Sequence, residues 1–296
     1  CCLLARSAGQ VVGVMPLAEA RWWPRGRALV SAPYCVEAGA IADDASARAA
    51  LEDAALELAR DRGVDFLEVR QSGGRRDAWP AHARFSGFAR TLAPSAEENL
   101  AAVPRKQRAM IRKGEAAGLR AGTGLALERF YALYALSVRN LGTPVYAPSL
   151  FQAIARHLAA FVDILQVTHD DATVAAVLSF RHRGCMMPYY AGAVPAARAL
   201  KAYDFMYWQL LCRALEHGCT RFDFGRSVVD SGAYAFKKNW GFTPRPLCYQ
   251  LVPLRDAGDP ALDPDSPFNR FAREAWSRLP LAIANRLGPL LARRLF

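Results

Sequence analysis

FDFGRSVVDSGAYAFKKNWGF, residues 222–242, is the most informative segment of this chain. Residues 222–225 alternate between phenylalanine and a small or acidic side chain, which predicts a strand with one buried face. Residues 230–232, Asp-Ser-Gly, predict a turn, and a short helix follows that ends at Gly241. The segment therefore predicts a strand, a turn and a helix in close succession.

Basic side chains gather around the predicted loop. Arg226 lies at the carboxyl end of the strand, and Lys237 and Lys238 lie on the short helix. Backbone N–H groups at a helix start can also receive an anion or a developing negative charge. This combination is typical of a transferase site.

Seven segments resemble the Fem-type branch of the GNAT acyltransferase superfamily, in particular FemAB-like proteins associated with bacterial exopolysaccharide and exosortase (PEP-CTERM) systems. They are PRKQRAMIRK at 104–113, LGTPV at 141–145, PYYAG at 188–192, YDFMYW at 203–208, FDFGRS at 222–227, GAYAFKKNWGF at 232–242 and WSRLPL at 276–281. The matches occur in order along nearly the whole chain and are weaker before about residue 93.

The resemblance implies an α/β protein of two tandem GNAT-like domains with mixed central sheets and a C-terminal helical extension. It implies transfer of an acyl or aminoacyl group, without a prosthetic group, from acyl-CoA or aminoacyl-tRNA. The acceptor would be an amine, or a hydroxyl, of a cell-envelope or exopolysaccharide precursor, received in a cleft between the two units. The donor would bind near residues 188–208 and 226–238.

The resemblance also implies catalytic roles for the pair Phe236-Lys237, which would line the acyl-donor site. Lys237 would stabilise negative charge on the carbonyl oxygen under attack, because an ammonium acts strongly on an oxyanion where water is scarce. The alternative is a surface helix with two solvated lysines. Asp223 could accept a proton from the attacking amine or could hold Arg226 in place.

The chain departs from the family pattern directly after Arg226 and Ser227. Related sequences usually carry a lysine at the next position, where this chain has Val228, followed by Asp230 in place of a glycine-rich turn. A cation is lost and a carboxylate is gained. This change favours a second hypothesis, a catalytically silent homologue that binds RNA or an anionic glycan precursor in a biosynthetic complex.

Several further residues are candidates for binding the donor. Arg105, Arg108 and Arg112 share one helical face by their three- and four-residue spacing, and such a face could clamp phosphates or could simply be solvated. The remaining candidates are Arg198 and Lys201 ahead of a predicted helix, Tyr190 beside a glycine, and Ser227.

The net charge of +11 and the isoelectric point near 9.6 favour polyanionic partners such as coenzyme A, tRNA or anionic lipid. The seven cysteines lack paired spacing, and the five histidines lack metal-ligand spacing, so we expect neither disulfides nor a metal site. No signal peptide and no apolar run long enough to cross a bilayer is visible, which favours the cytoplasm.

An internal repeat divides the chain. A predicted helix at 46–62 ends at Gly63 before an alternating strand, and a predicted helix at 203–217 ends in the same way at Gly218. We expect domains at 1–92, 93–255 and 256–296: a first GNAT-like domain, a second one, and a linker with C-terminal helices. Because the sequence begins with Cys1 inside a predicted strand, we expect the first domain to be incomplete.

The last predicted helix is amphipathic, with leucines and an isoleucine on one side and arginines on the other. Two interpretations remain open. Its apolar face could pack on the second domain, or the helix could contact an anionic membrane surface.

Overall fold

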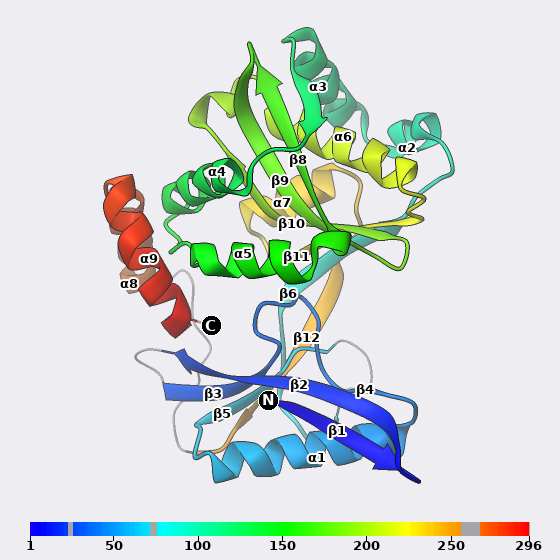
Figure 1. Ribbon diagram of the computed structural model, residues 1–296, viewed down its shortest axis with the longest axis vertical. Helices are drawn as coiled ribbons and strands as arrows, with labels where there is room; N and C mark the ends of the chain where they lie inside the picture. The colour runs from blue at the N-terminus through cyan, green and yellow to red at the C-terminus, as the bar shows by residue number, and fades with distance from the viewer. Residues whose placement is uncertain (23–25, 72–75, 256–266, 296) are drawn as a thin grey trace. The chain divides into compact units, whose positions relative to one another are not determined.

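A computed structural model describes residues 1–22, 26–71, 76–255 and 267–295 (Figure 1). The described residues form two compact units. The first is built mainly from Cys1–Ser86 and the strand that begins at Arg245, and the second mainly from Gly87–Pro244 and the C-terminal helical segment. The linker expected at the start of 256–296 lies outside the described residues.

The first unit is a mixed sheet with one covering helix. Its first three strands form an antiparallel series. The helix then carries the chain back to the end of the sheet where β3 begins, so the next strand runs parallel to β3. The short strand β4 (Ile41–Ala42) pairs with β2. The other elements are β1 (Cys2–Ser7), β2 (Gln10–Trp22), β3 (Gly26–Ser31), α1 (Ala45–Asp61), β5 (Phe66–Val69) and β12 (Arg245–Pro253).

The second unit repeats this plan with more helices. An antiparallel series of strands leads through a helix to a strand parallel to β10. Its strands are β7 (Arg120–Thr123), β8 (Val162–His169), β9 (Ala172–His182), β10 (Cys185–Ala193) and β11 (Arg221–Val228). Its helices are α2 (Ala96–Ala102), α3 (Arg105–Ala116), α4 (Leu127–Asn140), α5 (Pro148–His157), α6 (Ala202–Glu216), α7 (Gly232–Asn239), α8 (Pro267–Ser277) and most of α9 (Leu281–Leu295).

The predicted repeat is confirmed by identical helix ends. Gly63 after α1 and Gly218 after α6 have φ of 59° and 67°, in the left-handed region that glycine tolerates best. At each end the next residue donates its N–H to the carbonyl five residues earlier, Val64 to Ala59 and Cys219 to Ala214. The strands that follow, β5 and β11, hold the same place, parallel to the last strand of the preceding series.

The closing strand of each sheet comes from the other half of the sequence. Strand β6 (Ala81–Thr91) follows the first sheet along the chain, but its second half lies next to β11 in the second unit. The first sheet is instead closed by β12, which pairs antiparallel with β5. The domain limits expected at 92 and 255 therefore differ from the two units, because Phe88 packs in the core of the second unit and Val252 in that of the first.

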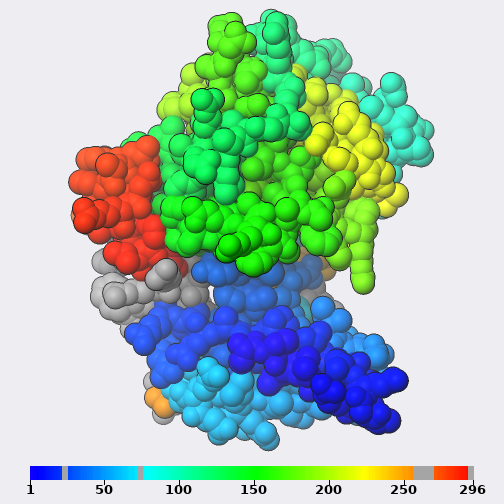
Figure 2. All heavy atoms as spheres, in the orientation of Figure 1, coloured from blue at the N-terminus to red at the C-terminus, as the bar shows by residue number. Residues whose placement is uncertain are grey.

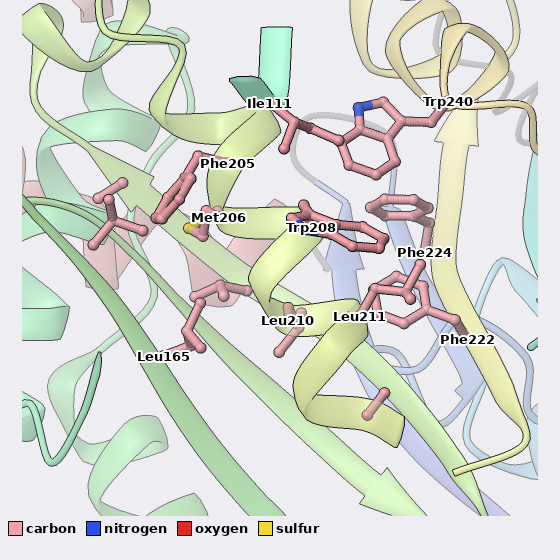
Figure 3. Close-up of a cluster of buried hydrophobic side chains, with 14 of the residues drawn as sticks. Ile111, Leu165, Phe205, Met206, Trp208, Leu210, Leu211, Phe222, Phe224 and Trp240 are labelled. Carbon is pink, nitrogen blue, oxygen red and sulfur yellow. The ribbon is translucent and has the colours of Figure 1, made fainter. Parts of the chain in front are cut away.

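The core of the second unit lies between α6 and the sheet (Figure 3). Phe205, Met206 and Leu210 of α6 face residues of several strands, and each is at most 4% exposed. Phe222 and Phe224 of β11 are buried as their alternation predicts, and their rings lie 5.0 Å apart. The first unit has its own smaller core around α1.

Candidate active site

A kink in β11 begins the candidate site. Gly225 has a φ of 66°, which interrupts the strand at the one position in it that lacks a Cβ. The side chain of Asp223 holds this conformation, since its Oδ1 accepts a hydrogen bond of 2.8 Å from the N–H of Gly225. The kink thereby turns neighbouring backbone carbonyls toward one point.

The ammonium of Lys237 occupies that point. Its Nζ donates to the carbonyl oxygens of Phe224 at 2.7 Å and Arg226 at 2.9 Å, and lies 3.4 Å from that of Gly225. In a regular strand successive carbonyls point to opposite sides, so three in a row reach one cation only because the strand is kinked. The kink and the lysine form one structural unit.

Helix α7 presents Lys237 to the strand. Ser231 begins the helix as its N-cap: its Oγ accepts from the N–H of Tyr234 at 3.2 Å and donates to the carbonyl of Val228 at 2.7 Å. The helix is thus fastened to the end of β11. Gly241, with a φ of 80°, follows the helix as expected.

The two neighbouring lysines of α7 lie in different environments. Lys237 is half-buried, its Nζ lies 5.4 Å from the centre of the Phe88 ring, and burial lowers its pKa to about 8, against the opposing effect of Asp223. Lys238 is exposed, with its Nζ 5.5 Å from the ring of Tyr234. The alternative of two solvated lysines therefore does not describe Lys237.

Phe236 attaches α7 to the core. It is half-buried and its ring centre lies 5.6 Å from that of Tyr207 and 6.2 Å from that of Trp240. Tyr207 also packs edge-on against Phe224. The aromatic side chains thereby fix the position of α7, and with it the reach of Lys237.

Three candidate residues of β11 lie in different environments: Asp223, Arg226 and Ser227. Asp223 holds the kink and lies 3.9 Å from a guanidinium nitrogen of Arg221. Arg226 is half-buried and its carbonyl belongs to the group around Lys237. The hydroxyl of Ser227 is buried and has no hydrogen-bond partner among the described residues. It can therefore form a hydrogen bond with a ligand that displaces the side chains around it.

The site includes two parallel strands, β10 and β11. Among the described residues they pair only at their starts, where Cys185 lies opposite Arg221 and Met186 opposite Phe222. Farther along, β10 shifts register between Pro188 and Tyr190, and β11 has its kink. An extended ligand that carries amide groups can form hydrogen bonds with backbone groups at such a divergence, in the way that an added β-strand does.

The remaining donor-binding candidates differ in their burial and in their position relative to α6. Tyr190 is 8% exposed, and its ring packs against those of Tyr134 and Phe151, so it lies in an aromatic core. Arg198 is exposed in a 3-10 turn (Pro195–Arg198), and Lys201, with a φ of 59°, directly precedes α6. These two cations lie at the helix start, where free N–H groups favour an anion.

The three arginines of the predicted basic face lie on α3. Arg105 and Arg112 are exposed, whereas Arg108 is half-buried, with a buried Nε that has no partner within the described part of the chain. Ile111, on an adjacent side of the helix, is 2% exposed. The helix therefore presents its cations outward and its apolar side to the core.

Sequence reasoning missed one residue that organises the site. Oδ1 of Asp204, in the first turn of α6, accepts from Nε1 of Trp240 at 3.0 Å and lies 3.5 Å from Nε2 of Gln107. Burial raises the pKa of Asp204. One carboxylate thus links α3, α6 and the end of α7. An acidic residue in the first turn of a largely apolar helix was the available signal.

Comparison with known proteins identifies the class of fold. Residues 101–238 match the model of an acetyltransferase (GNAT) domain, a region that lies wholly within the second unit. With the repeated architecture of the first unit, the chain has a tandem GNAT fold, as the sequence predicts. No curated protein matches the sequence.

Several solved structures have a similar fold. The chain resembles a crystal structure of FemX with a TM-score of 0.65 and 15% identity, covering 86% of this chain and 88% of that one. It resembles L-PGS from Bacillus licheniformis with a TM-score of 0.55 and 13% identity, over 93% and 89%. It resembles a tandem GNAT protein from the clavulanic acid biosynthesis pathway with a TM-score of 0.53 and 18% identity, covering 86% of this chain and 82% of that one. At these identities the likeness concerns the fold.

The described residues lack both a cluster of metal-binding side chains and a membrane-spanning helix. No group of three or more His, Cys, Asp or Glu side chains gathers there as a metal ion would require. Within the same residues, no helix is both long and apolar enough to span a bilayer.

Proposed function

We propose that this protein transfers an acyl or aminoacyl group to an amine, or a hydroxyl, of an acceptor. The observation that carries the proposal is the half-buried ammonium of Lys237, held by backbone carbonyls where β10 and β11 diverge. An extended donor that adds its amides to the diverging strands would bring its carbonyl carbon near this cation. The GNAT-type fold supports the same class of reaction.

The geometry of Lys237 supports an oxyanion-stabilising role. An ammonium has three N–H donors, and the bonds to Phe224 and Arg226 use two of them. The third has only the longer contact of 3.4 Å to Gly225. This donor can turn to the oxygen that becomes negative when the acceptor attacks the donor carbonyl, because hydrogen bonds to a developing charge are stronger than those to a neutral carbonyl.

The donor is proposed to be acyl-CoA or aminoacyl-tRNA, both of which carry phosphates. Arg198 and Lys201 at the start of α6 and the exposed arginines of α3 supply cations for them. The acceptor is proposed to be a cell-envelope or exopolysaccharide precursor. Its support is the resemblance of the sequence motifs to FemAB-like proteins and the fold shared with FemX.

A silent homologue remains a second candidate, because Val228 stands at the end of β11 where related sequences carry a lysine. Without that cation, residues 222–237 retain Arg226 and Lys237 as their cations. In this case the protein would bind an anionic donor or precursor without turnover.

Donor turnover distinguishes the two candidates. Incubation with acyl-CoA pools and, separately, with charged tRNA pools is expected to release free coenzyme A or deacylated tRNA in the presence of a cell-envelope extract, measured by mass spectrometry. Lys237→Ala serves as the matched control. Donor binding with no turnover in either pool would establish the silent homologue.

The basic face of α3 gives a separate prediction. Charge reversal in the double variant Arg105→Glu/Arg112→Glu is expected to weaken binding of the polyanionic donor about tenfold or more at low salt and little at high salt, because fewer counterions are released. Both side chains are exposed, so the fold should tolerate the change. Equal tRNA and coenzyme A affinities for variant and parent at low salt, measured by fluorescence titration, would identify a merely solvated face.

Arg108 is kept out of that variant because it is half-buried, with a buried Nε. The triple variant that adds Arg108→Glu would test the whole predicted face, but its result is interpretable only if thermal unfolding shows an intact fold. The double reversal Arg60→Glu/Arg129→Glu, at exposed positions of α1 and α4, provides a control that changes the net charge by the same amount as the double variant outside α3.

A further inference from the structure

The last helix, α9, buries its small residues and exposes its large apolar ones. Its small residues are buried: Ala284 is 2% exposed, and Gly288 lies so close to Val145 that an added Cβ would meet Cγ1 at 2.9 Å. Its large apolar residues point outward instead, since Ile283 is 46% and Leu290 is 60% exposed. Helices of globular proteins normally bury the large apolar face.

The outward residues form one continuous face. Ile283, Leu287 and Leu290 follow at spacings of four and three, which places them on the same side of the helix, and Leu287 is 42% exposed. The preceding helix α8 adds Phe271, which is 70% exposed. We call Ile283, Leu287 and Leu290 the α9 apolar face. An exposed apolar face of this kind marks an interaction surface.

The face is held in place rather than loosely attached. Arg139 of α4 donates from Nη1 to the carbonyl of Ser277 at the end of α8, at 2.9 Å. The backbone of Arg273 lies against Gly142, where an added Cβ would meet its carbonyl oxygen at 2.5 Å. Figures 1 and 2 show α9, in red, on the outside of the second unit beside α4 and α5. The apolar side chains are therefore presented by a fixed helix.

The charge around the face selects its partner. Residues 267–296 contain six arginines and one acidic residue, Glu274, which pairs with Arg278 at 2.5 Å. Both Arg278 and Arg286 are exposed, so the net charge of the segment is positive. A second copy of the chain packed face to face would bring these cations together, which costs free energy. An apolar face rimmed by arginines instead matches a surface with negative headgroups over a hydrocarbon interior.

We propose that the α9 apolar face docks the protein on an anionic phospholipid surface. The side chains of Ile283, Leu287 and Leu290 enter the boundary of the acyl chains, and the arginines remain at the headgroups. The inference stands apart from the proposed transferase activity, because it concerns binding alone.

Co-sedimentation with lipid vesicles tests the proposal. The full chain is expected to bind vesicles of phosphatidylcholine mixed with phosphatidylglycerol about tenfold or more tightly than phosphatidylcholine alone, and less tightly as salt increases. The triple variant Ile283→Ser/Leu287→Ser/Leu290→Ser is expected to lower binding to the mixed vesicles about tenfold or more, because the lost apolar contacts act together. Since these side chains are exposed, unfolding should remain cooperative.

A matched control replaces the same number of exposed apolar residues in the first unit. Leu4→Ser/Val11→Ser/Ile41→Ser removes side chains that are 52%, 50% and 72% exposed, and is expected to bind mixed vesicles like the parent. Absence of parent binding to mixed vesicles, or equal binding by the α9 triple variant, would overturn the proposal. Light scattering completes the test: a parent dimer that becomes a monomer in the α9 variant, without vesicle binding, would assign the face to a second copy.

Discussion

Lys237→Ala is expected to slow group transfer about a hundredfold or more, which corresponds to roughly 3 kcal/mol of transition-state stabilisation. The substitution removes the cation that lies on the kinked part of β11. The structure also predicts a loss of about 1–2 kcal/mol in the free energy of unfolding, because the carbonyls of Phe224 and Arg226 lose their partner.

The pH dependence of the rate separates an electrostatic from a structural role. Burial lowers the pKa of Lys237 to about 8, and only the protonated form carries the charge. The rate of the parent enzyme is therefore expected to fall as the pH rises through about 8. In Lys237→Arg the charge persists at higher pH, so this fall should disappear even if the maximal rate is reduced.

Lys238→Ala is the matched control, since Lys238 lies on the same helix but is exposed. Its rate is expected to remain close to that of the parent. Equal small effects of the two alanine variants, measured by steady-state kinetics with the true donor and acceptor, would exclude the catalytic role of Lys237. A rate that rises through pH 8 would indicate that the neutral amine acts as a base.

Gly192→Ala is expected to destabilise the protein by about 3 kcal/mol or more, or to prevent folding, because the added methyl group overpacks a close contact. Gly192 of β10 lies under α4, and an added Cβ would come within 2.4 Å of the carbonyl carbon of Leu133 and the backbone nitrogen of Tyr134. Backbone atoms cannot rotate away as a flexible side chain can, so α4 would have to move as a whole.

Urea unfolding measures this effect against Gly122→Ala. Gly122 lies in strand β7, and a Cβ there would meet only the side chain of Gln166, at 3.9 Å. This control is expected to change the free energy of unfolding by less than about 1 kcal/mol. Similar stability of the two variants would mean that α4 and β10 do not pack as closely as the structure indicates.

Local patterns of sequence were sufficient for much of the architecture. Gly63 and Gly218 end their helices with positive φ, and the alternation of Phe222 and Phe224 correctly predicted which side of β11 is buried. The strand, turn and helix of residues 222–242 also form as predicted. These features depend on the conformational freedom of glycine and on the period of side chains along a strand, which are properties of neighbouring residues.

The tertiary structure alone decided the contacts between distant segments. That β6 neighbours β11 while β12 closes the first sheet depends on which strand edges are open, and no local period encodes this. The same holds for Asp204, whose partners lie on two other helices, and for the carbonyls around Lys237. Besides its arginines, α9 carries one row of large apolar residues and one row of small residues, so the helical period could not tell which row would face the core. The close approach of Gly288 to Val145 decided that the small side is buried, because only small residues fit there.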